Sequence, residues 1–195
     1  MGSRVIRRTI KRCTSAALAG LLMACTTAVP VESHDYGMVT SGDFSFMNQS
    51  VRTYSWHPNS ERAYLSSDLD SAEVTKMVKM AIESEMNLRG YRLQNGQREG
   101  DVIIGFGLAE ESVLKDSTIF DYTKLSTGIP FYDKDGNKVE KGSLYMVMYR
   151  PNMTQPLWQT LAQSGIEQGL ARDQRQERIT TYISMILRDL PKVNP

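Results

Sequence analysis

A regular spacing of apolar side chains between residues 74 and 88 most limits what this chain can fold into. The apolar positions recur every three or four residues, which places them on one face of an α-helix. Asp70 and Glu73 precede them in the arrangement of a capping box, and Gly90 follows as a left-handed terminus. The pattern predicts an amphipathic helix that must bury its apolar face against another element.

Most other apolar segments of the chain have the composition of β-strands. These strand-forming runs occupy residues 51–56, 101–106, 144–149 and 157–163. A short segment with two prolines separates the last two runs, which predicts an antiparallel hairpin. A second helical stripe runs from Ile179 to Leu190. Strands gathered between two helices predict an α+β fold, with a mainly antiparallel sheet and both helices packed on one face.

The first 25 residues have the layout of a bacterial export signal. Basic side chains without any acidic one occupy its start, at Arg4, Arg7, Arg8, Lys11 and Arg12. A short apolar run from Ala16 to Met23 follows, and the small residue Ala24 precedes Cys25. The run is about half of the roughly 20 residues that span a bilayer, so we do not expect a permanent transmembrane helix.

The end of this run, Leu22-Met23-Ala24-Cys25, resembles the bacterial lipobox. The resemblance implies attachment of diacylglycerol to Cys25, cleavage after Ala24 and acylation of the new amino terminus. An ordinary signal peptide followed by a chance cysteine is the alternative. Because Cys13 lies in the leader, Cys25 would be the lone cysteine of the mature chain, and an internal disulfide is excluded. Thr26, where inner-membrane lipoproteins commonly have aspartate, favours the outer membrane.

These features predict three parts of the chain and its surroundings. We expect a lipoprotein signal peptide over residues 1–24, a flexible tether over residues 25–43 and a single periplasmic α+β domain over residues 44–195. Removal of the leader takes five of the 23 basic residues and none of the 22 acidic ones, which leaves 18 against 22 and a net charge of −4. An acidic mature chain disfavours nucleic acid as a partner. The expected partner is the outer membrane, held through the lipid on its periplasmic side.

Several short motifs follow one another along the mature chain. They are Thr53-Tyr-Ser-Trp-His-Pro58, Leu88-Arg-Gly-Tyr91, Asp101-Val-Ile-Ile104, Pro156-Leu-Trp-Gln159 and Ile186-Leu-Arg-Asp-Leu-Pro191. Their order resembles the bacterial lipoprotein family catalogued as domain of unknown function 4136, over roughly residues 44–191. The resemblance implies a periplasm-facing α+β domain and supplies no activity. The segment of residues 110–141 is longer than the family pattern.

The mature chain offers few side chains for catalysis or metal binding. Its two histidines, His34 and His57, fall in the predicted tether and at a strand end, and no nucleophile motif stands in a matching context. Asp133, Asp135 and Asn137 match the first ligand positions of a calcium loop, but the later positions do not. We therefore expect a turn there, no metal, no cofactor and no enzymatic activity.

One strand carries a candidate binding surface. Tyr145, Val147 and Tyr149 alternate along the run 144–149, so they share one face of the sheet. If no helix covers that face, the stripe suits a protein partner, a glycan or a lipid. If a helix covers it, these residues belong to the core.

The sequence is compatible with three functions. The first is non-catalytic binding or scaffolding at the outer membrane, with another envelope protein as a partner. The second is a carrier of a lipid or another small apolar envelope ligand, which requires an apolar pocket between sheet and helices. The third is an envelope enzyme, which requires a cleft with convergent ionisable residues of perturbed pKa.

Overall fold

The computed structural model describes residues 36–96, 98–167 and 169–193. Within these residues the strands are β1 (Tyr36–Gly42), β2 (Thr53–Trp56), β3 (Arg62–Tyr64), β4 (Arg92–Leu93), β5 (Val102–Glu110), β6 (Lys141–Tyr149) and β7 (Trp158–Gly165). The helices are α1 (Ser71–Leu88), α2 (Asp116–Thr123) and α3 (Arg172–Ile186). Residues 35–195 form one compact unit.

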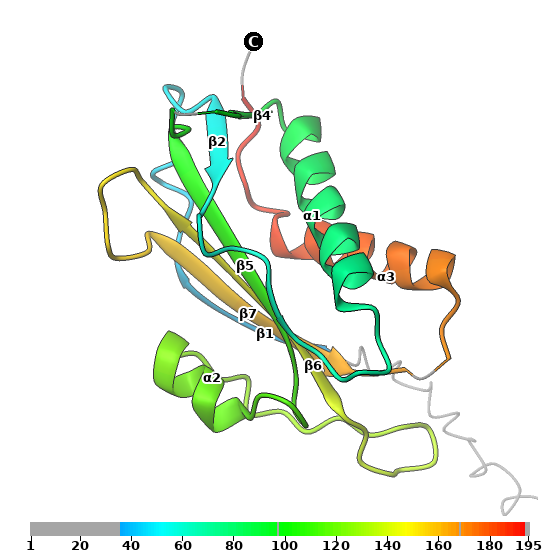
Figure 1. Ribbon diagram of the computed structural model, residues 1–195. Helices are drawn as coiled ribbons and strands as arrows, with labels where there is room; N and C mark the ends of the chain where they lie inside the picture. The colour runs from blue at the N-terminus through cyan, green and yellow to red at the C-terminus, as the bar shows by residue number, and fades with distance from the viewer. Residues whose placement is uncertain (1–35, 97, 168, 194–195) are drawn as a thin grey trace, which may run out of the picture. The chain divides into compact units, whose positions relative to one another are not determined.

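All seven strands belong to one sheet, in the order β1-β7-β6-β5-β2-β4, with β3 also paired to β5 (Figure 1). The longer strands β1, β7, β6 and β5 pair antiparallel with one another, as predicted. The short strands β2, β3 and β4 are parallel additions. The chain passes through α1 between β2 and β4, and a helical crossover of this kind returns a strand in the same direction. The predicted combination of helices with a mainly antiparallel sheet is confirmed, but the described residues form three helices where two were expected.

Two of the three helices cover the same face of the sheet. Side chains of α1 and α3 share one buried cluster with the strands, whereas Ile119 of α2 belongs to a smaller cluster with Ala109 and Leu161 on the opposite face (Figure 1). The prediction of two helices on one face therefore holds for α1 and α3 but omits α2. This helix has eight residues and buries only Ile119, so its sequence has too little periodicity to reveal it.

At the beginning of α1, one of the two predicted capping interactions is present, the one made by Asp70. The carboxylate of Asp70 accepts hydrogen bonds from the backbone N–H groups of Ala72 and Glu73, at 3.0 and 3.1 Å. The side chain of Glu73 was expected to return to the cap, but it accepts a hydrogen bond from Arg172 of α3 instead. Gly90 ends the helix with a positive φ of 89°, as its position predicted.

The predicted tether overlaps the folded domain. Residues 36–42 form β1, which pairs along its whole length with β7, from Tyr36 opposite Ser164 to Gly42 opposite Trp158. The expectation of a flexible segment up to residue 43 is therefore wrong for residues 36–42. Two glycines and a serine in this run weaken the sequence signal, and pairing with a long neighbour supplies the hydrogen bonds. The rest of the tether, the leader and Cys25 lie outside the described residues.

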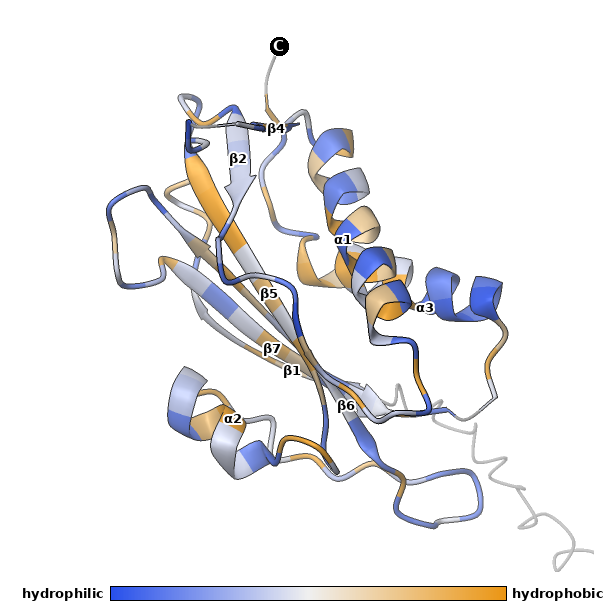
Figure 2. Cartoon of the chain, in the orientation of Figure 1, coloured by the Kyte–Doolittle hydropathy of each residue, from blue (hydrophilic) through white to orange (hydrophobic). Residues whose placement is uncertain are grey.

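The main core lies between the sheet and the two helices α1 and α3. Alternation along β5 and β6 turns Ile104, Met146 and Met148 toward the helices, and all three are fully buried. Figure 2 shows the beginning of β5 as strongly hydrophobic, with paler residues further along the strand. Of the described residues, no helix is long and apolar enough to cross a membrane.

Candidate ligand-binding cavity

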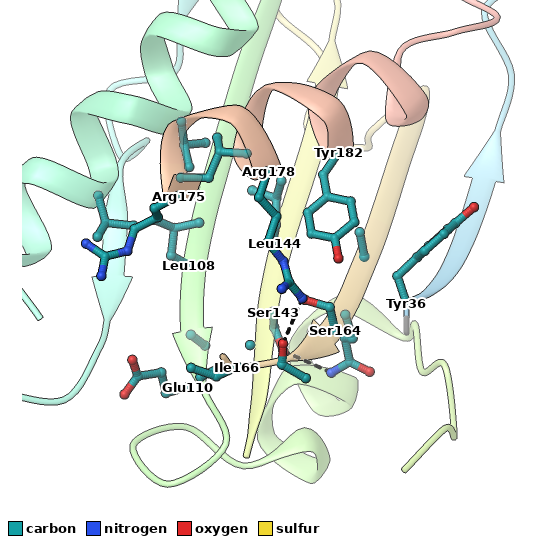
Figure 3. A pocket seen from close by; sticks show the side chains of 18 of the residues that line it. Tyr36, Leu108, Glu110, Ser143, Leu144, Ser164, Ile166, Arg175, Arg178 and Tyr182 are labelled. Atoms are coloured by element: carbon teal, nitrogen blue, oxygen red, sulfur yellow. Dashed lines mark hydrogen bonds between the residues drawn. The ribbon is translucent and has the colours of Figure 1, made fainter. Parts of the chain in front are cut away.

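An apolar cavity of about 200 Å³ lies on the helix-covered face of the sheet, at the end away from Met148. Its floor consists of Leu108 and Leu144, together with the small residues Gly142, Ala162 and Ser164 (Figure 3). Strand pairing brings these small residues side by side, because Gly142 lies opposite Ser164 and Leu144 opposite Ala162. The floor therefore lacks the volume that the methionines supply at the other end of the same strands.

The roof of the cavity comes from α1, α3 and the loop before α1. Val74 and Val78 of α1 and Ile179 and Tyr182 of α3 line it. The first half of α3, Arg172–Arg178, is almost entirely polar, and the buried residues of this helix are Ile183 and Ile186. Because apolar side chains fix only the second half of α3 in the core, its first half leaves space above the sheet.

Arg178 holds the first half of α3 in place at the rim of the cavity. Its guanidinium pairs with Glu167, donates a hydrogen bond to the backbone carbonyl of Gly165 at 3.0 Å and lies 5.5 Å from the ring centre of Tyr182. Arg178 thus connects the end of β7 and Glu167 to the helix α3. Such an arrangement gives the cavity a polar rim around an apolar interior.

Glu110 is the acidic group that lines this cavity most deeply. It is the last residue of β5, and its alternation with Phe106 and Leu108 turns it toward the helices. The residue is 4% exposed, and its Oε2 accepts a hydrogen bond from the backbone N–H of Ser66 at 2.8 Å. The cavity thus has a carboxylate in a wall that is otherwise mostly apolar.

The structure places the predicted surface of Tyr145, Val147 and Tyr149 on the opposite face of the sheet. Val147 is buried, and Tyr145 packs against the small cluster under α2 and donates a hydrogen bond from its hydroxyl to Gln159 at 2.7 Å. Tyr149 is partly buried and its ring centre lies 5.8 Å from that of His57. Burial raises the pKa of both tyrosines above the ordinary value. The stripe is therefore continuous in space but partly covered.

On the face of the sheet that α2 covers, a polar network connects α2 to the strands. Lys141 pairs with Asp116 in the first turn of α2, and Gln163 donates a hydrogen bond to the other oxygen of that carboxylate at 2.8 Å. Gln163 also donates to Ser143 at 2.9 Å. The side chain of Lys141 is only 7% exposed, so its charge is buried with a matching partner.

The remaining polar motifs have structural partners. The carboxylate of Asp133 accepts hydrogen bonds from the backbone N–H groups of Asp135 and Asn137, both at 2.9 Å, and these bonds lower its pKa. This is the geometry of the turn that the sequence predicted. In the described part of the chain, histidine, cysteine and acidic residues form no group of three that could hold a metal ion.

Sequence reasoning missed the cavity, although two of its signals are visible in the sequence. Glu110 continues the core-facing alternation of Ile104, Phe106 and Leu108, so an acid stands where an apolar residue is expected. The small residues Gly142, Ala162 and Ser164 occupy core-facing positions of two strands that otherwise have large side chains there. Neither signal reveals a cavity until the register and the path of α3 are known.

A family model described as a domain of unknown function, DUF4136, matches residues 38–192. The chain belongs to this family. The DUF4136 match begins inside β1, in agreement with the early start of the folded domain. No curated protein matches the sequence.

Three solved structures are similar to this chain at low sequence identity. A DUF4136 family protein from Bacteroides thetaiotaomicron has a TM-score of 0.51 and 13% identity, over 81% of this chain and 98% of that chain. A PelC dodecamer from Paraburkholderia phytofirmans has a TM-score of 0.46 and 8% identity, over 82% of this chain and 99% of that one. A PDZ domain protein from Parabacteroides distasonis has a TM-score of 0.46 and 10% identity, over 83% of this chain and 36% of that one.

Proposed function

We propose that this DUF4136 protein is a non-catalytic outer-membrane lipoprotein whose periplasmic domain binds the hydrocarbon tail of an amphiphile. The observation that carries the proposal is the apolar cavity between the sheet and α3. A carrier of a small apolar envelope ligand needs such a space, and the cavity lies between a sheet and helices where that function requires it. The leader and the lipobox-like sequence before Cys25 support the location.

The size of the cavity limits the ligand to one tail or one ring. An engineered apolar cavity of about 150 Å³ stays dry and binds benzene, whereas pockets for drug-sized ligands have about 300–1,000 Å³. At about 200 Å³ the cavity is close to the first kind. It therefore suits part of a single hydrocarbon chain, with the rest of the ligand extending past the rim.

An anchor on Cys25 would hold the cavity close to a supply of such molecules. Two or more acyl chains bind a membrane stably, so a protein that has them stays at the lipid surface. The net charge of −4 for the chain after Ala24 disfavours nucleic acid as a partner. A second envelope protein as partner stays a prediction, with Tyr145, Val147 and Tyr149 as its candidate surface. Photocrosslinking from position 149 in cells tests that prediction, and the absence of any specific adduct would contradict it.

Filling the floor of the cavity tests the main proposal. Ala162 lies between Met38 and Leu144 in the sheet register, so Ala162→Leu places three additional carbon atoms in the cavity. The chain from residue 26 onward contains the whole compact unit of residues 35–195 and has no lipid of its own to compete for the site. We expect it to bind one equivalent of decyl maltoside below its micellar concentration, and Ala162→Leu to weaken binding at least about tenfold, measured by calorimetry.

The matched control is Ser41→Leu. Ser41 is exposed on the opposite face of the same sheet, so the change adds a similar apolar group away from the cavity. Its binding should equal that of the unmodified chain. Equal binding by the Ala162→Leu variant, or no binding of the alkyl probe by any form, would overturn the proposal.

A further inference from the structure

Glu110 is a buried carboxylate for which the described chain supplies no cation. The residue is 4% exposed, and none of the ion pairs among the described residues involves it. Its contact within the chain is the hydrogen bond from the N–H of Ser66 to Oε2. A buried carboxylate is costly unless hydrogen bonds or an opposite charge compensate for the lost water, so a single amide N–H is a small complement for it.

The two arginines that line the cavity, and the buried Lys141 on the opposite face of the sheet, have other partners. Arg178 pairs with Glu167, and Lys141 pairs with Asp116 on the opposite face of the sheet. Arg175, which also lines the cavity, donates a hydrogen bond to the carbonyl of Leu170 at 3.4 Å. Glu110 differs in this respect from the buried Lys141 of the neighbouring strand, which has a charged partner. The buried base on one face thus has an acidic partner, whereas none of the ion pairs among the described residues includes the buried acid on the other face.

The second oxygen of Glu110, Oε1, has no hydrogen-bond partner among the described residues and is not sealed from solvent. None of the described side-chain oxygen and nitrogen atoms is both sealed from solvent and without a hydrogen-bond partner. No hydrogen bond to Oε1 is present among the described residues, so this atom keeps some accessible surface. Because Glu110 lines the cavity, Oε1 offers an acceptor at its β5 side, across the sheet from Tyr36 on β1 (Figure 3).

We infer that the ligand is a single-tailed amphiphile with a primary ammonium group, and that Glu110 accepts a hydrogen bond from that ammonium. This inference rests on the proposed tail-binding function and adds the class of head group. The Glu110 carboxylate has no positively charged partner and only one N–H donor among the described residues. A primary ammonium supplies both a positive charge and further N–H donors. The tail occupies the cavity above Leu144 and Ala162, and the head group lies at Glu110. An anionic head group would place a like charge against the carboxylate.

Three probes with the same tail separate charge from hydrogen bonding. Dodecylammonium has a charge and N–H donors, dodecyltrimethylammonium has the charge alone, and dodecyl sulfate has the opposite charge. With the chain from residue 26 onward, below micellar concentrations, we expect dodecylammonium to bind about tenfold more tightly than the trimethyl probe, and dodecyl sulfate to bind most weakly. Calorimetry measures the three affinities. Equal affinities for the two cations, or preference for the sulfate, would overturn the inference.

The variant Glu110→Gln keeps the shape of the side chain and an oxygen for the N–H of Ser66 but removes the charge. Its preference for dodecylammonium over the trimethyl probe should fall to within about threefold. Glu111→Gln is the matched control, because it removes the same charge one residue away, from a surface pair with Lys138. Unchanged preference in Glu110→Gln, or an equal loss in Glu111→Gln, would overturn the role of Glu110. If Glu110→Gln does not fold, the ranking of the three probes on the unmodified chain decides alone.

The same experiment separates the inference from the function on which it rests. If all three probes bind with similar affinity and Ala162→Leu weakens each of them, tail binding stands and the choice of head group is wrong. If none of the three binds, the tail-binding function itself fails.

Discussion

The two ends of the helix-covered sheet face contrast in the size of their side chains. At one end Met146, Met148 and Trp158 point toward the helices and are almost fully buried. Along the same two strands, at the other end, the corresponding positions are Gly142 and Ala162, with the cavity above them. One face of one sheet thus passes from a close-packed core to an open apolar space.

The contrast shows that the cavity is built into the strands rather than left by a misplaced helix. Packed interiors are filled nearly as densely as organic crystals, so a space of about 200 Å³ requires that several positions lack bulk together. The polar first half of α3 also contributes to the cavity, because it brings no large apolar side chain to the floor.

The largest effect expected from this contrast is a difference in the free energy of unfolding. Met148→Ala removes a fully buried side chain from the packed end and should destabilise the domain by about 2–5 kcal/mol. Leu144→Ala removes a partly exposed side chain beside the cavity and should cost about 1 kcal/mol. Urea unfolding of both variants measures the difference. Equal losses would mean that the cavity end is packed as firmly as the other end.

A smaller effect is expected from the tie between α3 and the rim. Arg178→Ala removes the bonds to Glu167 and Gly165 and should lower the free energy of unfolding by about 1 kcal/mol. Amide hydrogen exchange should rise in residues 172–178 and stay unchanged in α1. The control is Arg188→Ala, whose side chain is 72% exposed and pairs only with its neighbour Asp189 among the described residues. Uniformly faster exchange in both helices would contradict a local tie.

The smallest expected effect is on the pH dependence of stability, and it concerns Tyr54 in the main core. This effect appears only at alkaline pH. Burial, with the nearby Glu83 carboxylate as a second cause, raises its pKa from 10.0 to about 12. The neutral phenol is therefore favoured by folding, so its contribution is complete below pH 10 and is lost as the pH rises toward about 12. Urea unfolding at a series of alkaline pH values should show a stability that falls over this range. The fall should be shallower for Tyr54→Phe than for the unmodified chain.

The control for this pH dependence is Tyr122→Phe. Tyr122 is 85% exposed on α2, so its removal should leave the alkaline loss of stability as it is. A slope that does not change in Tyr54→Phe would mean that another group controls the alkaline transition.

Much of the fold could be predicted from local patterns. The apolar stripe of α1, the cap at Asp70 and the end at Gly90 are properties of neighbouring residues, and the structure has all three. The predicted antiparallel hairpin of β6 and β7 is also present. The order of short motifs was enough to recognise the DUF4136 family.

The elements that were missed depend on partners far away in the chain. The strand β1 has few strong strand-forming residues, and it is held by pairing with β7, more than 100 positions later. The helix α2 is short, and the ion pair of Asp116 with Lys141 and the small cluster with Leu161 hold it against the sheet. Contacts of such separation leave no trace in local periodicity.

The candidate site shows the same division. Glu110 could have been noticed as an acid at a core-facing position of a strand, because alternation alone assigns it to that face. The sequence does not say whether such an acid meets an arginine, a backbone N–H or open space. That outcome depends on where α3 and the loop containing Ser66 pass over the strand.

By itself, the sequence determined the helix α1, the central strands, the α+β class and the family, since these depend on spacing between near neighbours. The leader and Cys25 likewise belong to the sequence, as a prediction of export and lipid attachment. Only the tertiary structure decided that β1 joins the sheet, that α2 covers the other face and that a cavity opens beneath α3. The reason is that register and helix path, which bring small residues of different strands together beneath a polar half-helix, are set by the packing of the whole domain.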